Sequence, residues 1–268
     1  MNMNEKIISV GGVGGSGTRV IANMVGKAGF FMGNDLNDSS DTLLFTLLFK
    51  RQNVLVLDED EFDYSLNLFV KIMSSNEPLC KEELTYLNEL ASSDRTLHTK
   101  EWLQERLKYL NNTSSHYNWA WKEPNTHIVI EKLLNKMSKL KFVYVYRNGL
   151  DMAYSDNQNQ LKLWGSIFFN DYEMEINPKN SLRYWCIIHK RMLKLKQNYN
   201  ERVFMLDFDA LCLGADEILD DLLQFIGYRG NSKEFKNMIK TQSSINRHKN
   251  YSMTEFDKKD LDFVCSKI

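Results

Sequence analysis

The chain has 268 residues, of which 43% are hydrophobic and 26% charged, and its formal net charge at pH 7 is -1. This composition is that of an ordinary globular protein, and the length suits one large α/β domain. A nearly neutral chain has no overall field that would attract nucleic acid or an anionic membrane, so any affinity for anions must come from a local site.

The cysteines and the apolar segments narrow the class of protein further. Four cysteines lie far apart and form no C-x-x-C pair, which argues against a zinc site and favours reduced thiols in a cytosolic protein. We expect no signal peptide, because glycines follow before a long apolar core could form, and no apolar run approaches the length of a membrane span. The sequence thus predicts a single domain, residues 1–268, that is cytoplasmic, has no membrane span and has no nucleic-acid partner.

The first half of the chain begins with a strand and continues mainly as helices. Lys6 to Val10 is a short β-branched run that ends in glycines, which is typical of a buried strand. Apolar residues at helical spacing predict a helix from Thr18 to Ala28, and residues 39–41 can cap a further helix that runs through Phe49. The acidic run at 58–63 is interpreted as a solvated loop or a helix start. Helical patterns continue to about Leu110.

The second half alternates strands with helices. Strands are predicted at "NWAWK" (118–122), "KFVYVYR" (141–147) and "RVFMLDF" (202–208), and helices at 181–197 and 216–226. This order predicts an α/β fold of three layers, a parallel sheet with helices on both faces. The helical stretch at about 40–110 is too long for one crossover, so we interpret it as an insertion over the strand ends, where such folds bind ligands.

The first strand leads into the stretch "SVGGVGGSGTRV", residues 9–20. A glycine turn between a strand and a helix exposes backbone N–H groups to an anion. The pattern fits a dinucleotide fingerprint, but Asp35, at the right offset for its acidic residue, follows a poor second strand. It also fits the start of a nucleotide-kinase P-loop, yet Thr18 and Arg19 stand where that loop needs Lys and Ser or Thr. The loop therefore indicates an anion site without naming the anion.

A second motif supplies another anion site. In "YVYRNGLDMAYS" (144–155), Arg147 ends the strongest strand and Ser155 follows eight residues later. The carboxyl ends of parallel strands face one edge of the sheet, so this motif and the glycine loop should lie together, and an Arg fork with a hydroxyl suits a phosphate. The alternative for Arg147 is a surface ion pair, for example with Asp151.

With this motif the chain resembles the sulfotransferases that use 3′-phosphoadenosine 5′-phosphosulfate (PAPS). The loop Gly15-Ser16-Gly17-Thr18-Arg19 is similar to the family's loop around the 5′-phosphosulfate, and Arg147 with Ser155 is similar to its 3′-phosphate pair. "WAWKEPNTHI" (119–128), "VFMLDFDAL" (203–211) and "SSINRHK" (243–249) resemble further family segments in the right order. The resemblance implies a fold with a P-loop-like turn. It also implies that the donor contacts Gly14, Gly15, Ser16, Gly17, Thr18, Arg19, Arg147, Ser155 and Arg247.

The sequence departs from the family at Gly15, where most members carry Lys or Arg. Lys122 and Arg19 are the cations that could replace it, and Lys122 is the candidate that stabilises the moving sulfuryl group. Glu123 or His127 is the candidate general base, since both lie within reach of Lys122. Structural roles for these two residues, an ion pair and a helix cap, remain an alternative.

The resulting hypothesis is metal-independent transfer of a sulfuryl group from PAPS to a hydroxyl or amine acceptor, by in-line displacement. A carbohydrate or glycolipid acceptor is what the resemblance implies, and the insertion at 40–110 would select it. Two alternatives stay open: a P-loop-type nucleotide or small-molecule kinase, which would need the missing Lys, and a non-catalytic nucleotide-binding protein, which the Gly15 departure would suit.

Overall fold

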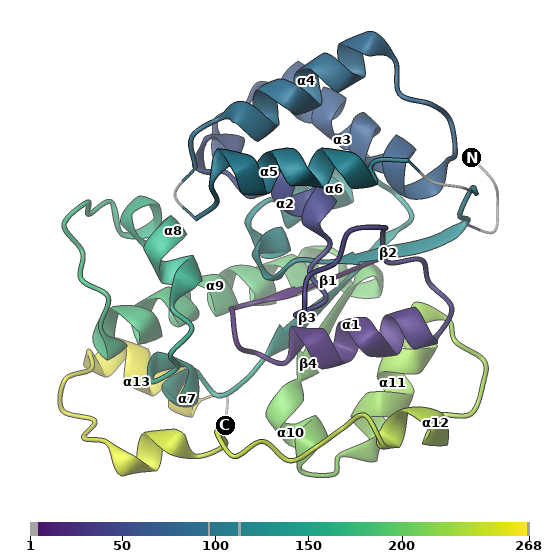
Figure 1. The fold of residues 1–268 in the computed structure, drawn as a ribbon. Helices are drawn as coiled ribbons and strands as arrows, with labels where there is room; N and C mark the ends of the chain where they lie inside the picture. Colours follow the sequence, from purple (N-terminus) through teal and green to yellow (C-terminus); the bar gives the residue numbers. More distant parts are fainter. Residues whose placement is uncertain (1–4, 96, 112–113, 267–268) are drawn as a thin grey trace.

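The computed structural model describes residues 5–95, 97–111 and 114–266. Its centre is a four-stranded parallel sheet with the order β2-β1-β3-β4 (Figure 1). The strands are β1 (Lys6–Gly12), β2 (Asn118–Lys122), β3 (Leu140–Tyr146) and β4 (Val203–Asp207). All four strands run in one direction, so their carboxyl ends meet at one edge, and the predicted three-layer α/β fold is confirmed.

One face of the sheet packs against the helix that follows the glycine loop and the helices that follow β4. Helix α1 (Thr18–Lys27) contacts β1 and β2, and α10 (Phe208–Cys212) and α11 (Asp216–Ile226) contact β3 and β4. The strands alternate as a pleated sheet requires, since Ile8 and Val10 lie in this hydrophobic cluster, whereas Ile7 lies in the opposite one.

The other face is covered by helices from three parts of the chain. Helix α6 (Ile130–Lys136) contacts β3, α9 (Pro178–Asn198) contacts β4, and α8 (Asn159–Phe169) packs on α9. Figure 1 shows α9 running behind the sheet, with α8 at the same end of the molecule as α7 (Gly149–Ala153). This arrangement places α8 beside the edge where the strands end.

The inserted helices lie above β2 in Figure 1. They are α2 (Leu43–Phe49), α3 (Glu59–Ser74), α4 (Lys81–Ser92) and α5 (Lys100–Arg106), with short 3-10 turns at Gln52–Leu55 and Leu107–Tyr109. Phe45 stacks on Trp121 at 5.8 Å between ring centroids, and Phe69 meets the same ring edge-on at 5.2 Å. The insertion is therefore attached to the sheet through aromatic side chains of β2.

Two predictions about helix starts have different outcomes. The acidic run does start a helix: Asp58 caps α3 and accepts a hydrogen bond from Glu61 N at 2.8 Å. The capping of α2 by residues 39–41 is wrong, because Thr42 is the residue that precedes the helix and no side chain caps it. Residues 39–41 instead contact Lys122 at the end of β2 and Asn23 on α1, to which Ser40 Oγ donates at 2.8 Å.

The last part of the chain returns to the strand ends. After α11 come α12 (Lys233–Lys236), a 3-10 turn at Arg247–Asn250 and α13 (Lys258–Cys265). The Asp151 carboxylate on α7 accepts hydrogen bonds from the N–H groups of Asn246 and His248, which fixes the returning segment beside α7. Among the described helices, none combines the length and the apolar character that crossing a membrane requires.

Candidate active site

The glycine loop joins β1 to α1 through a tight turn. Ser16 N donates to Val13 O at 3.1 Å, and Gly15 and Gly17 both have positive φ angles, of 91° and 92°. Such angles favour glycine because other residues have a Cβ atom that crowds the following carbonyl. The first N–H groups of α1 have no acceptor within the helix, so the loop and the helix end together present donors to an anion.

The loop also holds a buried hydroxyl and lies against the second predicted anion motif. Ser16 is only 1% exposed, and its Oγ has no hydrogen-bond partner among the described residues. A Cβ atom built at Gly15 would lie 3.3 Å from Ser155 Oγ. The structure thus brings the loop and Ser155 together, and the backbone angle at Gly15 explains why a Lys or Arg would be strained there.

Arg147 follows β3 and is buried, with 4% of its surface exposed. Its Nε donates to Asp209 Oδ1 at 2.6 Å and its Nη1 to Ser244 Oγ at 2.9 Å, whereas Nη2 has no partner among the described residues. The suggested surface ion pair with Asp151 is wrong, because the carboxylate that meets the guanidinium is Asp209, at the start of α10. A fixed guanidinium with one unused N–H group is suited to a ligand anion.

Arg247, on the segment that returns to the strand ends, also lies close to Ser155. Its Nη1 donates to Tyr154 O at 3.0 Å, in the residue next to Ser155. The segment is held there by Asp151, whose Oδ1 lies 2.6 Å from His248 Nδ1. Arg147 and Ser155 flank α7 in the sequence, and Arg247, far along the chain, joins them in the folded protein.

Lys122 ends β2 with its side chain buried. Its Nζ donates to Ser39 O at 3.0 Å and forms an ion pair with Asp41. Arg19 Nη1, on α1, lies 3.5 Å from Asp38 O. The two cations predicted to replace the missing basic residue of the loop therefore contact one short segment, residues 38–41.

Glu123 lies beside Lys122 in the chain but has different partners. Its Oε1 is 3.0 Å from Lys50 Nζ, and its carboxylate accepts hydrogen bonds from Asn125 N at 2.5 Å and Asn125 Nδ2 at 2.9 Å. Glu123 is fully buried, and it caps the 3-10 turn at Pro124–Ile128. Neighbouring residues of an extended chain point to opposite sides, so Lys122 and Glu123 enter different surroundings.

His127 is fully buried and neutral at pH 7, because burial lowers the pKa of its imidazole to about 3. Its Nε2 lies 3.0 Å from Gln160 Oε1, and Gln160 Nε2 donates to Gly12 O at 2.9 Å. The Gln160 amide is oriented by its second bond, so the tautomer assigned to His127 carries its proton on Nε2. Nδ1 is then a bare acceptor without a partner among the described residues.

Comparison with known families identifies the chain. A model described as the sulfotransferase domain matches residues 9–262, nearly the whole chain. This chain belongs to the sulfotransferase family. It is an enzyme of that class, and the kinase and non-catalytic alternatives are set aside.

Solved structures of similar fold are sulfotransferases as well. The sulfotransferase domain of the Synechococcus PCC 7002 olefin synthase matches with a TM-score of 0.53 and 11% identity, covering 99% of this chain and 94% of that one. The sulfotransferase domain from the curacin biosynthetic pathway matches with a TM-score of 0.52 and 11% identity, covering 100% and 98%. Sulfotransferase STF9 from Mycobacterium avium matches with a TM-score of 0.50 and 11% identity, covering 99% and 76%. A search of curated protein sequences found no match.

Sequence reasoning missed several polar residues that contact the candidate site residues. Asp209 orients Arg147, and its signal was available, since an acid directly after the fourth strand faces the same edge. Asp41 was assigned only to capping, although it binds Lys122. Gln160 and Lys50 had no signal, because each lies far along the chain from its partner.

Proposed function

We propose that this sulfotransferase uses PAPS as its sulfuryl donor. The observation that carries the proposal is Arg147, a buried guanidinium that two side chains hold in place while Nη2 keeps an unused N–H group beside the glycine-loop edge. PAPS has phosphate groups at both ends of its nucleoside, so a binder needs two separated anion sites. The glycine loop and the Arg147–Ser155–Arg247 group meet that requirement.

Space for a ligand lies beside Arg147. A cavity of about 350 Å³ is lined by Arg147 and by three carboxylates, of which Asp209 is paired with Arg147 and Asp151 with the returning segment, while Asp207 caps α10. Ser16 Oγ and Arg147 Nη2 are buried polar atoms without protein partners, and such atoms cost free energy unless a ligand or water binds them. In our proposal the residues Gly14 to Arg19 hold the 5′ end of the donor, and Arg147, Ser155 and Arg247 hold the 3′-phosphate.

The chemistry needs a cation where charge develops and a base for the acceptor proton. An acceptor oxygen or nitrogen attacks sulfur, the bond from sulfur to the bridging oxygen breaks, and the proton leaves the acceptor. Lys122 and Arg19, which contact one segment beside α1, are the proposed cations for the leaving oxygen. Glu123 is the proposed base, with His127 as the second candidate, since the Glu123 partner Lys50 also lines a pocket in the insertion.

The acceptor is proposed to be a carbohydrate or glycolipid hydroxyl or amine, and the transfer is proposed to need no metal. Among the described residues no group of three His, Cys, Asp or Glu side chains gathers as a metal site. In this proposal Lys122 and Arg19 supply the positive charge at the leaving oxygen, so transfer of label from PAPS should survive EDTA. Loss of transfer on chelation, restored by added divalent metal, would overturn metal independence.

The donor is tested by thermal unfolding with nucleotides. A ligand that binds only the native state raises the melting temperature by mass action, so PAP, the desulfonated product, should raise it more than ATP or NAD does. Lys122→Ala should leave this PAP shift nearly unchanged while it slows single-turnover transfer strongly. A shift with NAD and none with PAP would refute the proposed donor.

A further inference from the structure

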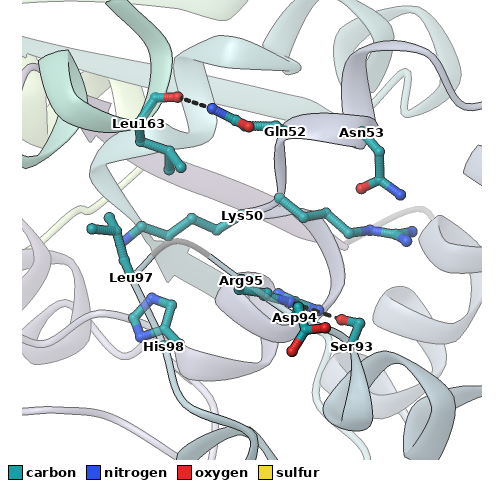
Figure 2. Close-up of a pocket in the computed structure, with 10 residues that line it drawn as sticks. Lys50, Gln52, Asn53, Ser93, Asp94, Arg95, Leu97, His98 and Leu163 are labelled. Atoms are coloured by element: carbon teal, nitrogen blue, oxygen red, sulfur yellow. Dashed lines mark hydrogen bonds between the residues drawn. The ribbon is translucent and has the colours of Figure 1, made fainter.

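The inserted helices form a pocket that the donor proposal does not use. Figure 2 shows this cavity of about 410 Å³, whose walls come from the end of α2, the 3-10 turn after it, the segment that follows α4 and one residue of α8. Lys50 faces this space from the end of α2, and Arg95 and His98 face it from the segment between α4 and α5. Leu97 and Leu163 are the apolar residues among those that line it, and the others carry polar or charged groups.

The pocket is connected to the proposed catalytic residues on two sides. Lys50 lines it and forms the ion pair with Glu123, 3.0 Å away. Leu163 lies one helical turn after Gln160, the residue that bonds both His127 and the glycine-loop strand at Gly12. A molecule in this pocket would therefore lie next to the segment that follows β2 and near the end of β1, where the sulfuryl group is transferred in our proposal.

The charges around the pocket are mainly positive. Arg95 donates to the carbonyl oxygens of Thr46 at 2.9 Å and Leu47 at 2.5 Å, and no carboxylate pairs with it within the described chain. Burial, and then Arg51, lower its pKa to about 10, so the guanidinium stays charged at pH 7. The acid that lines the pocket, Asp94, is itself paired with Lys100 at 3.1 Å.

His98 lies among these positive charges, and its Nε2 has no hydrogen-bond partner among the described residues. Burial first, and then the neighbouring Lys50, Arg95 and Arg106, together lower its pKa to about 4. The imidazole is therefore neutral at pH 7. It stacks on Trp102 with ring centroids 4.2 Å apart, and its buried Nε2 has no partner in the described part of the chain.

From these contacts we infer that the pocket binds the acceptor, and that the acceptor is a small polar molecule with an acidic group, a carboxylate, phosphate or sulfate, beside its reacting hydroxyl or amine. This inference rests on the proposed function and adds the acceptor's charge. The Lys50 ammonium has N–H groups beyond the one facing Glu123, and His98 Nε2 can donate beside it. Arg95 supplies a fixed positive charge, since carbonyl groups already occupy its donors.

Matched acceptor pairs test the charge. Label transfer from PAPS is measured with methyl glucoside against methyl glucuronide and glucose 6-phosphate, which share hydroxyls and differ in the acid. The acidic compounds should react with the lower KM. Equal or better use of the neutral sugar would overturn the inference.

Variants on the pocket rim test the location. Asn53 lines the pocket and is exposed, so Asn53→Glu adds a negative charge without touching the Glu123 ion pair, and Asn53→Gln is its neutral control. Asn53→Glu should raise the KM for the acidic sugars several-fold and leave the KM for the neutral sugar unchanged. Lys50→Gln should raise KM for the acidic sugars about 10- to 100-fold, the value of a charge-assisted contact. Lys162→Gln removes an exposed lysine of α8 outside the pocket and should change neither the KM for the acidic sugars nor the KM for the neutral sugar.

Thermal unfolding and PAP binding are measured as well. If no sugar accepts label, thermal unfolding of the PAP-bound protein with methyl glucuronide or inorganic phosphate decides. A stabilisation that Asn53→Glu removes supports the inference, and no stabilisation overturns it. If PAP itself fails to bind wild type, the proposed function fails, whereas normal PAP binding with acceptance of neutral sugars alone refutes only the acidic acceptor.

Discussion

The strand-end edge with Arg147 and the pocket in the inserted helices use charge in different ways. At the edge, Arg147 is fixed by Asp209 and Ser244, and the glycine loop adds backbone donors from β1 and α1. In the pocket, Lys50, which follows α2, is paired with Glu123, and His98, in the segment before α5, stacks on Trp102. In our proposals the edge holds the donor and the pocket holds the acceptor.

This contrast follows from how the two regions are supported. The edge is made where parallel strands end, so the sheet itself fixes the distance between the loop and Arg147. The pocket is made by short helices and turns that touch the sheet through the aromatic contacts of Phe45 and Phe69 with Trp121. Loops and short helices on a rigid scaffold can change their side chains without loss of the fold.

The largest expected effect tests which region supplies the base. Glu123→Gln should slow single-turnover transfer about 10²–10⁴-fold, because a general base is lost, while His127→Gln should slow it far less. PAP affinity and the melting temperature of each variant are the controls, since Glu123→Gln also leaves Lys50 without its partner. Rates near wild type in both variants would contradict the assignment and make Asp41, beside Lys122, the next candidate.

A smaller effect tests the edge as the phosphate site. Arg147→Ala should weaken PAP about 10- to 100-fold, the value of a charge-assisted contact, and adenosine 5′-phosphosulfate, which lacks the 3′-phosphate, much less. Isothermal titration of both nucleotides measures the difference. Asp209→Asn keeps Arg147 but weakens its anchor, and should give an intermediate loss. Equal losses for both nucleotides would place Arg147 away from the 3′ end.

The backbone of the loop gives an effect of about 1–2 kcal/mol. Gly15→Ala places a Cβ at φ 91°, 3.3 Å from Ser155 Oγ, so both the free energy of unfolding and PAP affinity should fall. Gly29→Ala is the matched control, because Gly29 has φ 96° and nothing within 4 Å of its Cβ position. The control should lose stability alone. Denaturant unfolding measures the loss of stability and PAP titration measures the loss of affinity. A similar loss of PAP affinity in Gly15→Ala and Gly29→Ala would show that the loop is not part of the donor site.

The smallest effect concerns pH. The pKa values of His127 and His98 are lowered to about 3 and about 4, by burial first, so the unfolded chain binds protons below pH 6.5 that the folded chain does not. The free energy of unfolding should therefore fall as pH drops from 7 towards 4. His127→Gln and His98→Gln should each flatten this slope when unfolding is measured at pH 7 and pH 5. An unchanged slope in His127→Gln would show that the imidazole is accessible to protons in the folded protein.

Much of the edge was predictable, because its residues follow strands. The strand at 141–147 and the spacing from Arg147 to Ser155 placed two site residues at the sheet edge, and the structure brings Ser155 against Gly15. The fold class and the family were predicted from the same motifs and are confirmed. The roles of Lys122, Glu123 and His127 stay predictions.

By itself the sequence determined the α/β fold and the edge of the sheet where our proposal places the donor, because hydrophobic periodicity and glycines act over a few residues and parallel strands end on one side. Only the tertiary structure decided the partners: Asp209 rather than Asp151 for Arg147, Asp41 for Lys122, and Lys50 for Glu123. These pairs join residues 62 or more positions apart, whose meeting depends on how helices pack on the sheet. The charge of the pocket in the inserted helices was decided in the same way, since it arises from side chains that approach one another only in the folded chain.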